Sequence, residues 1–235
     1  MIKLLDILEN KILVPRRSRE ERAKNHQIVI QKQIQQYMKG GGEGDLDLHN
    51  LPITSLPQGL EVGGDLHLHF SQIASLPKGL VVSLSLDLRN TKITSLPQDL
   101  EVGGNLKLSN SPIRSLPQGL EVGGNLYLSN TLITSLPQGL KVGGGLYLEN
   151  TKITSLSQDL KVGGSLDLSD TPIASLPQDL KIGRNLYLTN TKITSLPQGL
   201  KVGEDLDLRN TPLSKKYSEE EIRSMVPGVK GEIYL

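Results

Sequence analysis

Hydrophobic residues recur along the chain with a period of twenty residues. Each unit contains two leucines separated by one residue. The first leucine of each pair is Leu46, Leu66, Leu86, Leu106, Leu126, Leu146, Leu166, Leu186 or Leu206. Side chains alternate between the two faces of a β-strand, so L-x-L points both leucines to one face and the middle residue to the other. The period, unbroken by insertions, predicts nine stacked repeats that each begin with a short strand.

The remainder of each unit does not fit a regular helix. The unit can be written L-x-L-x-x-T-x-I-x-x-L-P-x-x-L-x-V-G-G-x, as in residues 126–145. The proline removes an amide donor and fixes φ, while paired glycines such as Gly123 and Gly124 supply freedom for a tight corner. We therefore expect an extended or turn-like return path. A single unit buries little by itself, but stacked units close a continuous aliphatic core.

The two ends of the chain depart from the period and predict caps. Residues 1–44 are expected to form an N-terminal helical cap and a Gly-rich hinge, residues 45–212 the nine repeats, and residues 213–235 a C-terminal cap. Within the N-terminal cap, Leu5, Leu8 and Ile12 share one helical face, a capping box at Ser18 opens a second helix, and Ile30, Ile34, Tyr37 and Met38 continue its apolar stripe. In the C-terminal cap we expect a short helix from Ser218 and a closing strand at Ile233–Leu235.

This pattern resembles the leucine-rich-repeat family, L-x-x-L-x-L-x-x-N-x-L, whose fourth, sixth and eleventh positions are matched by Leu126, Leu128 and Ile133. The twenty-residue unit with L-P-x-x-L is similar to the short bacterial and phage repeats, including those of secreted bacterial effectors. The resemblance implies an α/β-class repeat solenoid with a concave parallel β-sheet and a turn-like convex side. In two departures from the pattern, Gly123 replaces the first leucine, with Val122 expected to fill the space, and Thr or Ser replaces the asparagine in eight units. We expect these hydroxyls to bond to neighbouring backbone.

Composition narrows the classes of function. The formal net charge is +1, and no cysteine is present, so a thiol nucleophile, a disulfide and a Cys-ligated zinc are excluded. No phosphate loop, H-E-x-x-H or G-x-S-x-G motif occurs, and the sequence predicts a non-enzymatic protein without a cofactor. The run from Arg16 to Lys24 holds five basic residues but is interrupted by two glutamates and lacks an aromatic, which favours a solvated helix face over a nucleic-acid site.

The N-terminus shows neither a signal peptide nor a membrane span, because Asp6 and Glu9 interrupt its apolar stretch. We therefore expect a cytoplasmic, soluble protein that does not associate with membranes. Export as an effector and association with a phage particle both stay open.

Residues that differ between units while the scaffold repeats are the candidates for binding. On the concave face these are Tyr127, Tyr147, Tyr187, Lys107, Asp167, Asp87 and Arg89. Tyrosine offers a large apolar surface together with a hydroxyl and is enriched at interfaces. Tyrosine is also a good strand former, so a purely structural role stays open.

A second group near the start of the repeats combines carboxylates with imidazoles, as divalent metal sites do. Its members are Asp47, His49, Asp65, His67 and His69. The alternative is cross-strand pairing of these residues on a solvated face.

The charges on the return path change sign along the stack, from glutamate at position 121 to lysine at position 141 and beyond. Either water screens the row of lysines or the row meets an acidic partner.

Taken together, the sequence predicts a protein–protein interaction module that binds through its concave face, with a structural or self-assembling element as the alternative. We expect a monomer, with end-to-end association through the closing strand as the other possibility.

Overall fold

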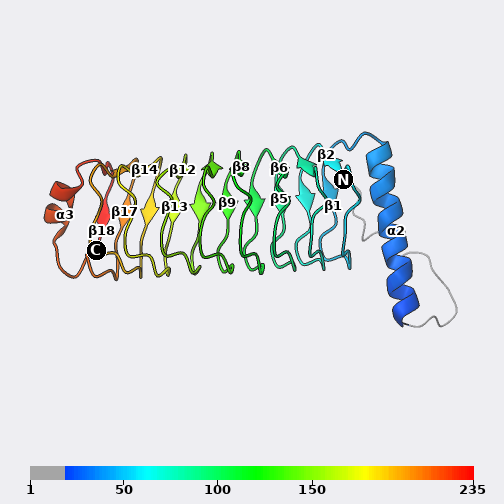
Figure 1. The fold of residues 1–235 in the computed structure, drawn as a ribbon, viewed down its shortest axis with the longest axis horizontal. Coiled ribbons are helices and arrows are strands. Elements are labelled where there is room, and N and C mark those ends of the chain that lie inside the picture. Colours follow the sequence, from blue (N-terminus) through cyan, green and yellow to red (C-terminus); the bar gives the residue numbers. More distant parts are fainter. Residues whose placement is uncertain (1–18) are drawn as a thin grey trace.

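The chain coils into an elongated stack of turns. The structure, a computed structural model, describes residues 19–235, and their side chains from residue 27 onward. Figure 1 shows the turns stacked along the long axis, with helix α2 (Arg19–Lys39) at one end and helix α3 (Glu219–Met225) at the other. The expected first helix with Leu5, Leu8 and Ile12 and the expected cap residue Ser18 lie outside the described residues.

The L-x-L segments form one parallel sheet, sheet A, in which sequence neighbours are also neighbours in space. Leu46 pairs with Leu66 and each later leucine with its equivalent twenty residues on, so the register of the sheet is the period of the sequence. The strands of sheet A are β1 (Leu46–Asp47), β3 (Leu66–His67), β5 (Leu86–Asp87), β7 (Leu106–Lys107), β9 (Leu126–Tyr127), β11 (Leu146–Tyr147), β13 (Leu166–Asp167), β15 (Leu186–Tyr187), β17 (Leu206–Asp207) and β18 (Ile233–Tyr234). The expected parallel sheet is confirmed.

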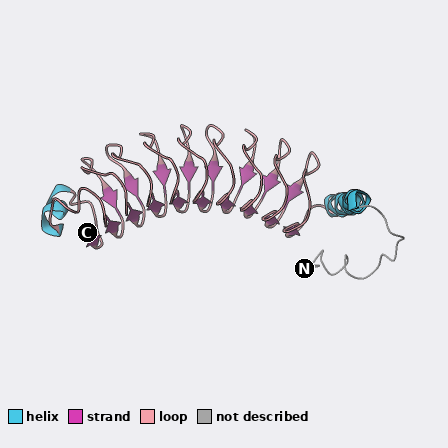
Figure 2. Cartoon of the chain, turned by 90° about the horizontal axis from the view of Figure 1, so that it is seen from below, coloured by secondary structure: helices cyan, strands magenta, loops and turns pink. Residues whose placement is uncertain are grey.

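The return path forms a second parallel sheet, sheet B, which the sequence pattern did not predict. Backbone hydrogen bonds between turns hold it, such as those from the Lys141 amide to the Leu120 carbonyl (3.0 Å) and from the Gly143 amide to the Val122 carbonyl (2.9 Å). Its strands are β2 (Glu61–Val62), β4 (Val81–Val82), β6 (Glu101–Val102), β8 (Glu121–Val122), β10 (Lys141–Val142), β12 (Lys161–Val162), β14 (Lys181–Ile182) and β16 (Lys201–Val202). The solenoid curves, with sheet A along its concave edge (Figure 2).

Aliphatic side chains fill the space between the two sheets. Leu126, Leu128 and Ile133 have no exposed surface, and Val122 is 2% exposed, which confirms that it occupies the space left by Gly123. Full burial of such a side chain stabilises the fold by about 1.5–3 kcal/mol. The hydroxyl of Thr131 donates a hydrogen bond to the Leu128 carbonyl (2.7 Å), and the equivalent Thr or Ser does the same in six other turns. The expected bond from these hydroxyls to neighbouring backbone is confirmed.

Two backbone positions restrict the residue type by different mechanisms. After each sheet A strand the chain passes through the left-handed region, as at Asn130 (φ 59°), where asparagine is tolerated better than most residues. Phe70 occupies the same conformation (φ 58°). Gly123 does not have a positive φ, so the explanation by backbone freedom was wrong there. A Cβ at Gly123 would lie 2.1 Å from the Gly103 carbonyl oxygen, and glycine is required because successive turns approach so closely.

Both ends of the core are covered. At the first turn Ile30 and Ile34 of α2 have no exposed surface, and the Gln31 side-chain amide donates to the Ser55 carbonyl at 3.0 Å. At the other end α3 begins with a capping box between Ser218 and Glu221, and its Ile222 is fully buried. The closing strand β18 pairs with β17 through Leu206 and Ile233. The C-terminal helix and strand expected from the sequence are confirmed.

Candidate functional site

The concave face is built from the residue between the two leucines of each sheet A strand and from the residue two positions later. Because the leucines point into the core, these residues point away from it. Most of the middle residues are half-buried, but Asp87 and Asp207 are 2% and 3% exposed. The concave face therefore has solvent-accessible and buried polar positions on one common scaffold.

Two rows of polar side chains cross the first three strands of sheet A. Asp47, His67 and Asp87 are paired in register on β1, β3 and β5. A second row follows two residues later, just after the end of each strand. We call the six residues the polar grid: Asp47, His67 and Asp87 in one row, His49, His69 and Arg89 in the other. The structure thus places Asp47, His49, His67 and His69 of the expected group on the same face as Asp87 and Arg89.

Asp87 is the most deeply buried member of the polar grid, and Arg89 neutralises it. The guanidinium donates from Nε to Oδ1 (2.9 Å) and from Nη2 to Oδ2 (2.7 Å). Burial by itself would raise the pKa of Asp87, but the hydrogen bonds and the charge of Arg89 outweigh burial and lower it. The carboxylate therefore stays ionised at neutral pH. Asp207 and Arg209 repeat the same pair near the other end of the sheet.

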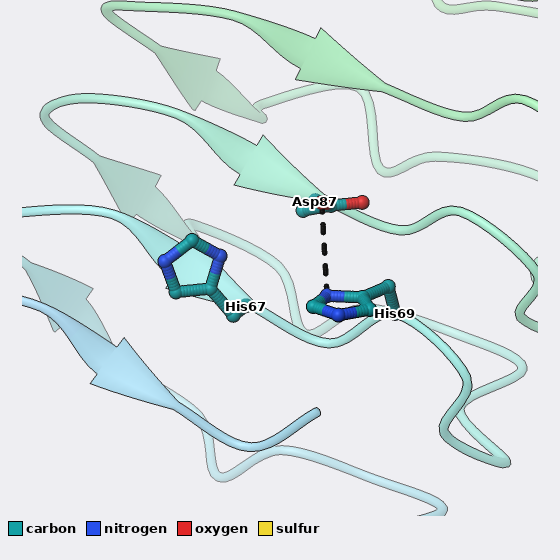
Figure 3. A group of neighbouring side chains, drawn as sticks. All are labelled: His67, His69 and Asp87. Carbon is teal, nitrogen blue, oxygen red and sulfur yellow. Dashed lines mark ion pairs between the residues drawn. The ribbon is translucent and has the colours of Figure 1, made fainter. Parts of the chain in front are cut away.

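His69 lies within ion-pair distance of this carboxylate, as the dashed line in Figure 3 marks, but makes no hydrogen bond to it. Its Nδ1 is 3.6 Å from Oδ2 of Asp87, beyond hydrogen-bonding distance, and the ring lies flat on His49 with centroids 4.8 Å apart. Figure 3 shows His67 and His69 with Asp87 on the adjacent strand. Nδ1 of His69 is buried and has no hydrogen-bond partner among the described residues, an arrangement that costs about 1–3 kcal/mol when nothing else binds the group. Burial lowers the pKa of His69, which favours the neutral ring.

The remaining residues expected in a metal site take other partners. Asp47 contacts Nδ1 of His49 at 2.5 Å, and the Asp65 side chain accepts a hydrogen bond from the Ser85 amide at 2.7 Å. Asp65 belongs to a ladder in which the side chain of the residue before a sheet A strand accepts a hydrogen bond from the amide of its equivalent in the next turn, as Asp45, Asp65 and Asn105 do. The structure therefore brings His67 and His69 to Asp87, whereas Asp65 points along the sheet.

Two tyrosine rings form a flat pair at the centre of the concave face. The rings of Tyr127 and Tyr147 stack with centroids 4.8 Å apart and an interplanar angle of 6°. Both side chains are half-buried and lie outside the core. The Tyr127 hydroxyl is 3.0 Å from the Asn125 side-chain nitrogen, so this ring leans back along its own strand. Burial and the neighbouring Tyr127 raise the pKa of Tyr147.

Gly145 gives the second ring its position. A Cβ at Gly145 would lie 2.8 Å from the hydroxyl oxygen of Tyr147 and 2.9 Å from its ring. The equivalent residue in the preceding turn, Asn125, accepts a hydrogen bond from the Gly145 amide at 2.6 Å, but glycine has no side chain to continue the ladder to Ser165. The ladder is therefore interrupted at the position over which Tyr147 lies.

Charged and aromatic side chains flank the pair on both sides. Lys107 is the register partner of Tyr127, and Asp167 is the partner of Tyr147. Tyr187 is the next strand's partner of Asp167, so one residue separates it from the stacked rings. Five of the expected concave candidates thus form a continuous row: Lys107, Tyr127, Tyr147, Asp167 and Tyr187.

Sheet B carries a separate row of charges on its outer surface. The Lys141 ammonium is 2.5 Å from the Glu121 carboxylate where the sign changes, and both side chains are more than half exposed. Beyond that point Lys141, Lys161, Lys181 and Lys201 occupy equivalent positions, with Lys141 paired with Lys161 and Lys181 with Lys201. Such an exposed ion pair contributes at most about 1 kcal/mol.

Comparisons with known proteins bear on the fold. No protein-family model and no curated protein sequence matches the chain. Among solved structures, a Shigella effector leucine-rich-repeat domain is 19% identical with a TM-score of 0.50, and the match covers 97% of this chain and 93% of that one. This likeness, together with the twenty-residue register of sheet A, decides the architecture. The chain has the leucine-rich-repeat fold.

Two other leucine-rich-repeat proteins are similar in part. A protein from Leptospira interrogans is 25% identical with a TM-score of 0.48, over 79% of this chain. The chain spans 59% of the length of that protein. The leucine-rich effector protein YopM from Yersinia pestis is 15% identical with a TM-score of 0.30, over 89% of this chain and 94% of that one.

On this leucine-rich-repeat scaffold, three features of the site escaped the sequence analysis. They are Gly145, which underlies the Tyr147 ring, Asp207, which is buried, and Phe70, which has a positive φ. Each carries a signal in the sequence: Gly145 is the glycine among Asp, Asn and Ser equivalents, Asp207 is followed by Arg209 as Asp87 is by Arg89, and Phe70 replaces an Asn or Asp.

Within the described residues, none of the helices has the length and apolar character needed to cross a membrane.

Proposed function

We propose that the protein is a non-enzymatic interaction module that binds a protein partner through the concave face of sheet A. The stacked pair of Tyr127 and Tyr147 carries this proposal. The two nearly parallel, stacked rings offer a large contact surface that lies outside the core. Aromatic anchors of this kind dominate the binding energy of protein interfaces.

The neighbouring charges suggest what the partner presents. Lys107 lies beside one ring and Asp167 beside the other. A complementary partner has an apolar centre, with an acidic group toward Lys107 and a basic group toward Asp167. The polar grid is a weaker candidate for protein binding, because Asp87 and Arg89 already satisfy one another.

The test replaces Tyr127, Tyr147 and Tyr187 together by serine. The native partner is captured with the wild-type chain, identified by mass spectrometry, and titrated against both proteins. Loss of a central aromatic commonly costs about 2 kcal/mol or more, so we expect the triple variant to bind at least about thirtyfold more weakly. The stability of the chain should change little, since surface substitutions typically stay within about 0.5 kcal/mol each.

The matched control changes Lys92, Lys152 and Lys192 to serine, three exposed residues on the return path. It should bind as the wild type does. Equal binding by wild type and the tyrosine variant would reject the concave face as the binding surface, and a large drop in melting temperature would assign the rings a structural role.

Self-assembly is the rival function, and the end of sheet A favours it. The side chains of Tyr234, the last residue of β18, and of Leu235 are 45% and 41% exposed, and this last strand has a free edge in the described chain. An open strand edge can pair with a second molecule. Light scattering that gives the monomer mass across a wide range of concentrations would reject this rival.

A further inference from the structure

We propose that His67, His69 and Asp87 form a binding site for one divalent transition-metal cation that takes imidazole and carboxylate ligands, such as Zn²⁺. Each residue offers one ligand atom, and the three atoms lie within 4.8 Å of one another. They come from adjacent strands of a rigid sheet, with His67 and Asp87 in register and His69 two residues along the same face. The site is separate from the tyrosine pair and does not depend on its function.

The donor set fits a transition metal better than magnesium or calcium. Imidazole nitrogen suits zinc, copper, iron and nickel, whereas magnesium and calcium prefer oxygen ligands. Zinc bonds nitrogen and carboxylate oxygen at about 2.0–2.2 Å, so the donors must move closer together than they are. Both histidine rings are partly exposed, and a rotation of either ring would bring its donor nitrogen closer to the cation.

The unsatisfied nitrogen of His69 is the observation that points to a ligand. Its Nδ1 is buried, lacks a hydrogen-bond partner among the described residues, and lies 3.6 Å from Oδ2 of Asp87. Proteins rarely leave a buried polar atom without a partner. A cation between Nδ1 and the carboxylate would give this nitrogen the partner that it lacks.

A second pair in the same protein separates the structural role of Asp87 from a role in metal binding. Asp207 and Arg209 reproduce the contacts of Asp87 and Arg89, with Nη2 to Oδ2 at 2.5 Å instead of 2.7 Å. The preceding strand presents Tyr187 and Thr189 to Asp207, where Asp87 meets His67 and His69. The ion pair alone therefore needs no histidine, and the two imidazoles are an addition specific to the polar grid.

Three protein ligands leave a fourth coordination position open, as in catalytic and ligand-binding zinc sites. The side chain of His69 is 23% exposed and lies on the concave face. Water or a side chain of a bound partner would occupy that position.

The experiment titrates the full chain with Zn²⁺ alone by isothermal calorimetry. We expect one ion per chain. His67→Ala and His69→Ala should each weaken binding at least about tenfold, since even loss of an outer-shell partner costs 10–100-fold in metal affinity. Asp87→Asn should weaken it similarly, while Asp207→Asn, its matched control, should bind as the wild type does.

Arg89→Gln sharpens the test of the carboxylate. Because Arg89 occupies both oxygens of Asp87, its removal should tighten Zn²⁺ binding if Asp87 is a ligand. Unchanged or weaker binding in a folded Arg89→Gln chain would remove Asp87 from the site and overturn the proposal.

A nuclear magnetic resonance measurement on the wild type tests the site without relying on any variant, which could fail to fold. One equivalent of Zn²⁺ should shift the imidazole signals of His67 and His69 and leave His26 unchanged. Absence of saturable Zn²⁺ binding, or equal binding by the His67→Ala/His69→Ala double variant, would overturn the proposal.

Discussion

The polar grid and the tyrosine pair occupy equivalent backbone positions on one sheet, yet their side chains behave in opposite ways. In the grid, Asp87 is buried and held by Arg89, and Asp47 contacts His49. In the pair, Tyr127 and Tyr147 stack on each other and present their surface outward. The strand register is the same in both regions. The scaffold therefore sets where a side chain is displayed, and the residue at that position sets whether it pairs with a charged neighbour or stacks on another ring.

The largest effects are expected when one of the two regions is deleted from the chain. Deletion of residues 61–80 removes His67 and His69, and deletion of residues 141–160 removes Tyr147. Both chains should remain folded, because each turn of a solenoid contacts only its neighbours. A ten-residue deletion of 141–150 should abolish cooperative unfolding, since the strand leucines then lose their register. Circular dichroism and thermal melting measure the outcome, and an unfolded twenty-residue deletion would contradict the equivalence of the turns.

Acid should reduce the contribution of the polar grid to the stability of the fold and leave the contribution of the tyrosine pair unchanged. The pKa of Asp87 is lowered from its usual 3.8 because Arg89 outweighs burial, so the stabilisation by the ionised carboxylate is present above that pH and is lost as the pH falls through the lowered value. At neutral pH we expect the free energy of unfolding of the wild type to be about 1.5–3 kcal/mol larger than that of Asp87→Asn. This is the range for hydrogen bonds to charged groups.

Urea unfolding at several pH values measures this difference. It should shrink below pH 3.8, and Asp207→Asn should behave in the same way because the pKa of Asp207 is lowered by the same type of pair. For Tyr147→Ser the difference from wild type should stay constant over the acid range. If the stability difference between wild type and Asp87→Asn stayed the same in strong acid, the ion pair would not be the cause of that difference.

The smallest expected effect comes from exchanging residues at the left-handed position of the two regions. Phe70 beside the grid and Asn130 beside the pair both have positive φ. Because left-handed backbone costs most residues about 1–2 kcal/mol and asparagine less, Phe70→Asn should stabilise the chain by about 1 kcal/mol, and Asn130→Phe should destabilise it by a similar amount. Urea midpoints report both. If Phe70→Asn were destabilising instead, the edge-on contact of Phe70 with His69 would outweigh the strain.

Much of the concave face could be predicted from the sequence, because alternation along a strand is local. The L-x-L spacing identified Tyr127, Tyr147 and His67 as outward-facing and Leu126 as core. Which outward residues touch one another could not be predicted in the same way. Asp65 and Asp87 are both near His67 in the pattern, but rotamers and hydrogen bonds turn Asp65 along the ladder and leave Asp87 beside His69.

The period, the strands of sheet A and the aliphatic core could all be predicted from the sequence alone. These follow from one local rule repeated every twenty residues, since a strand or helix is coded within a few neighbouring side chains. The tertiary structure alone decided that the return path pairs into sheet B, that Gly123 is needed for the close approach of Gly103, and that Tyr127 and Tyr147 lie flat together. Each of these contacts joins residues twenty positions apart, and its geometry depends on the spacing and curvature of the turns, which no single unit encodes.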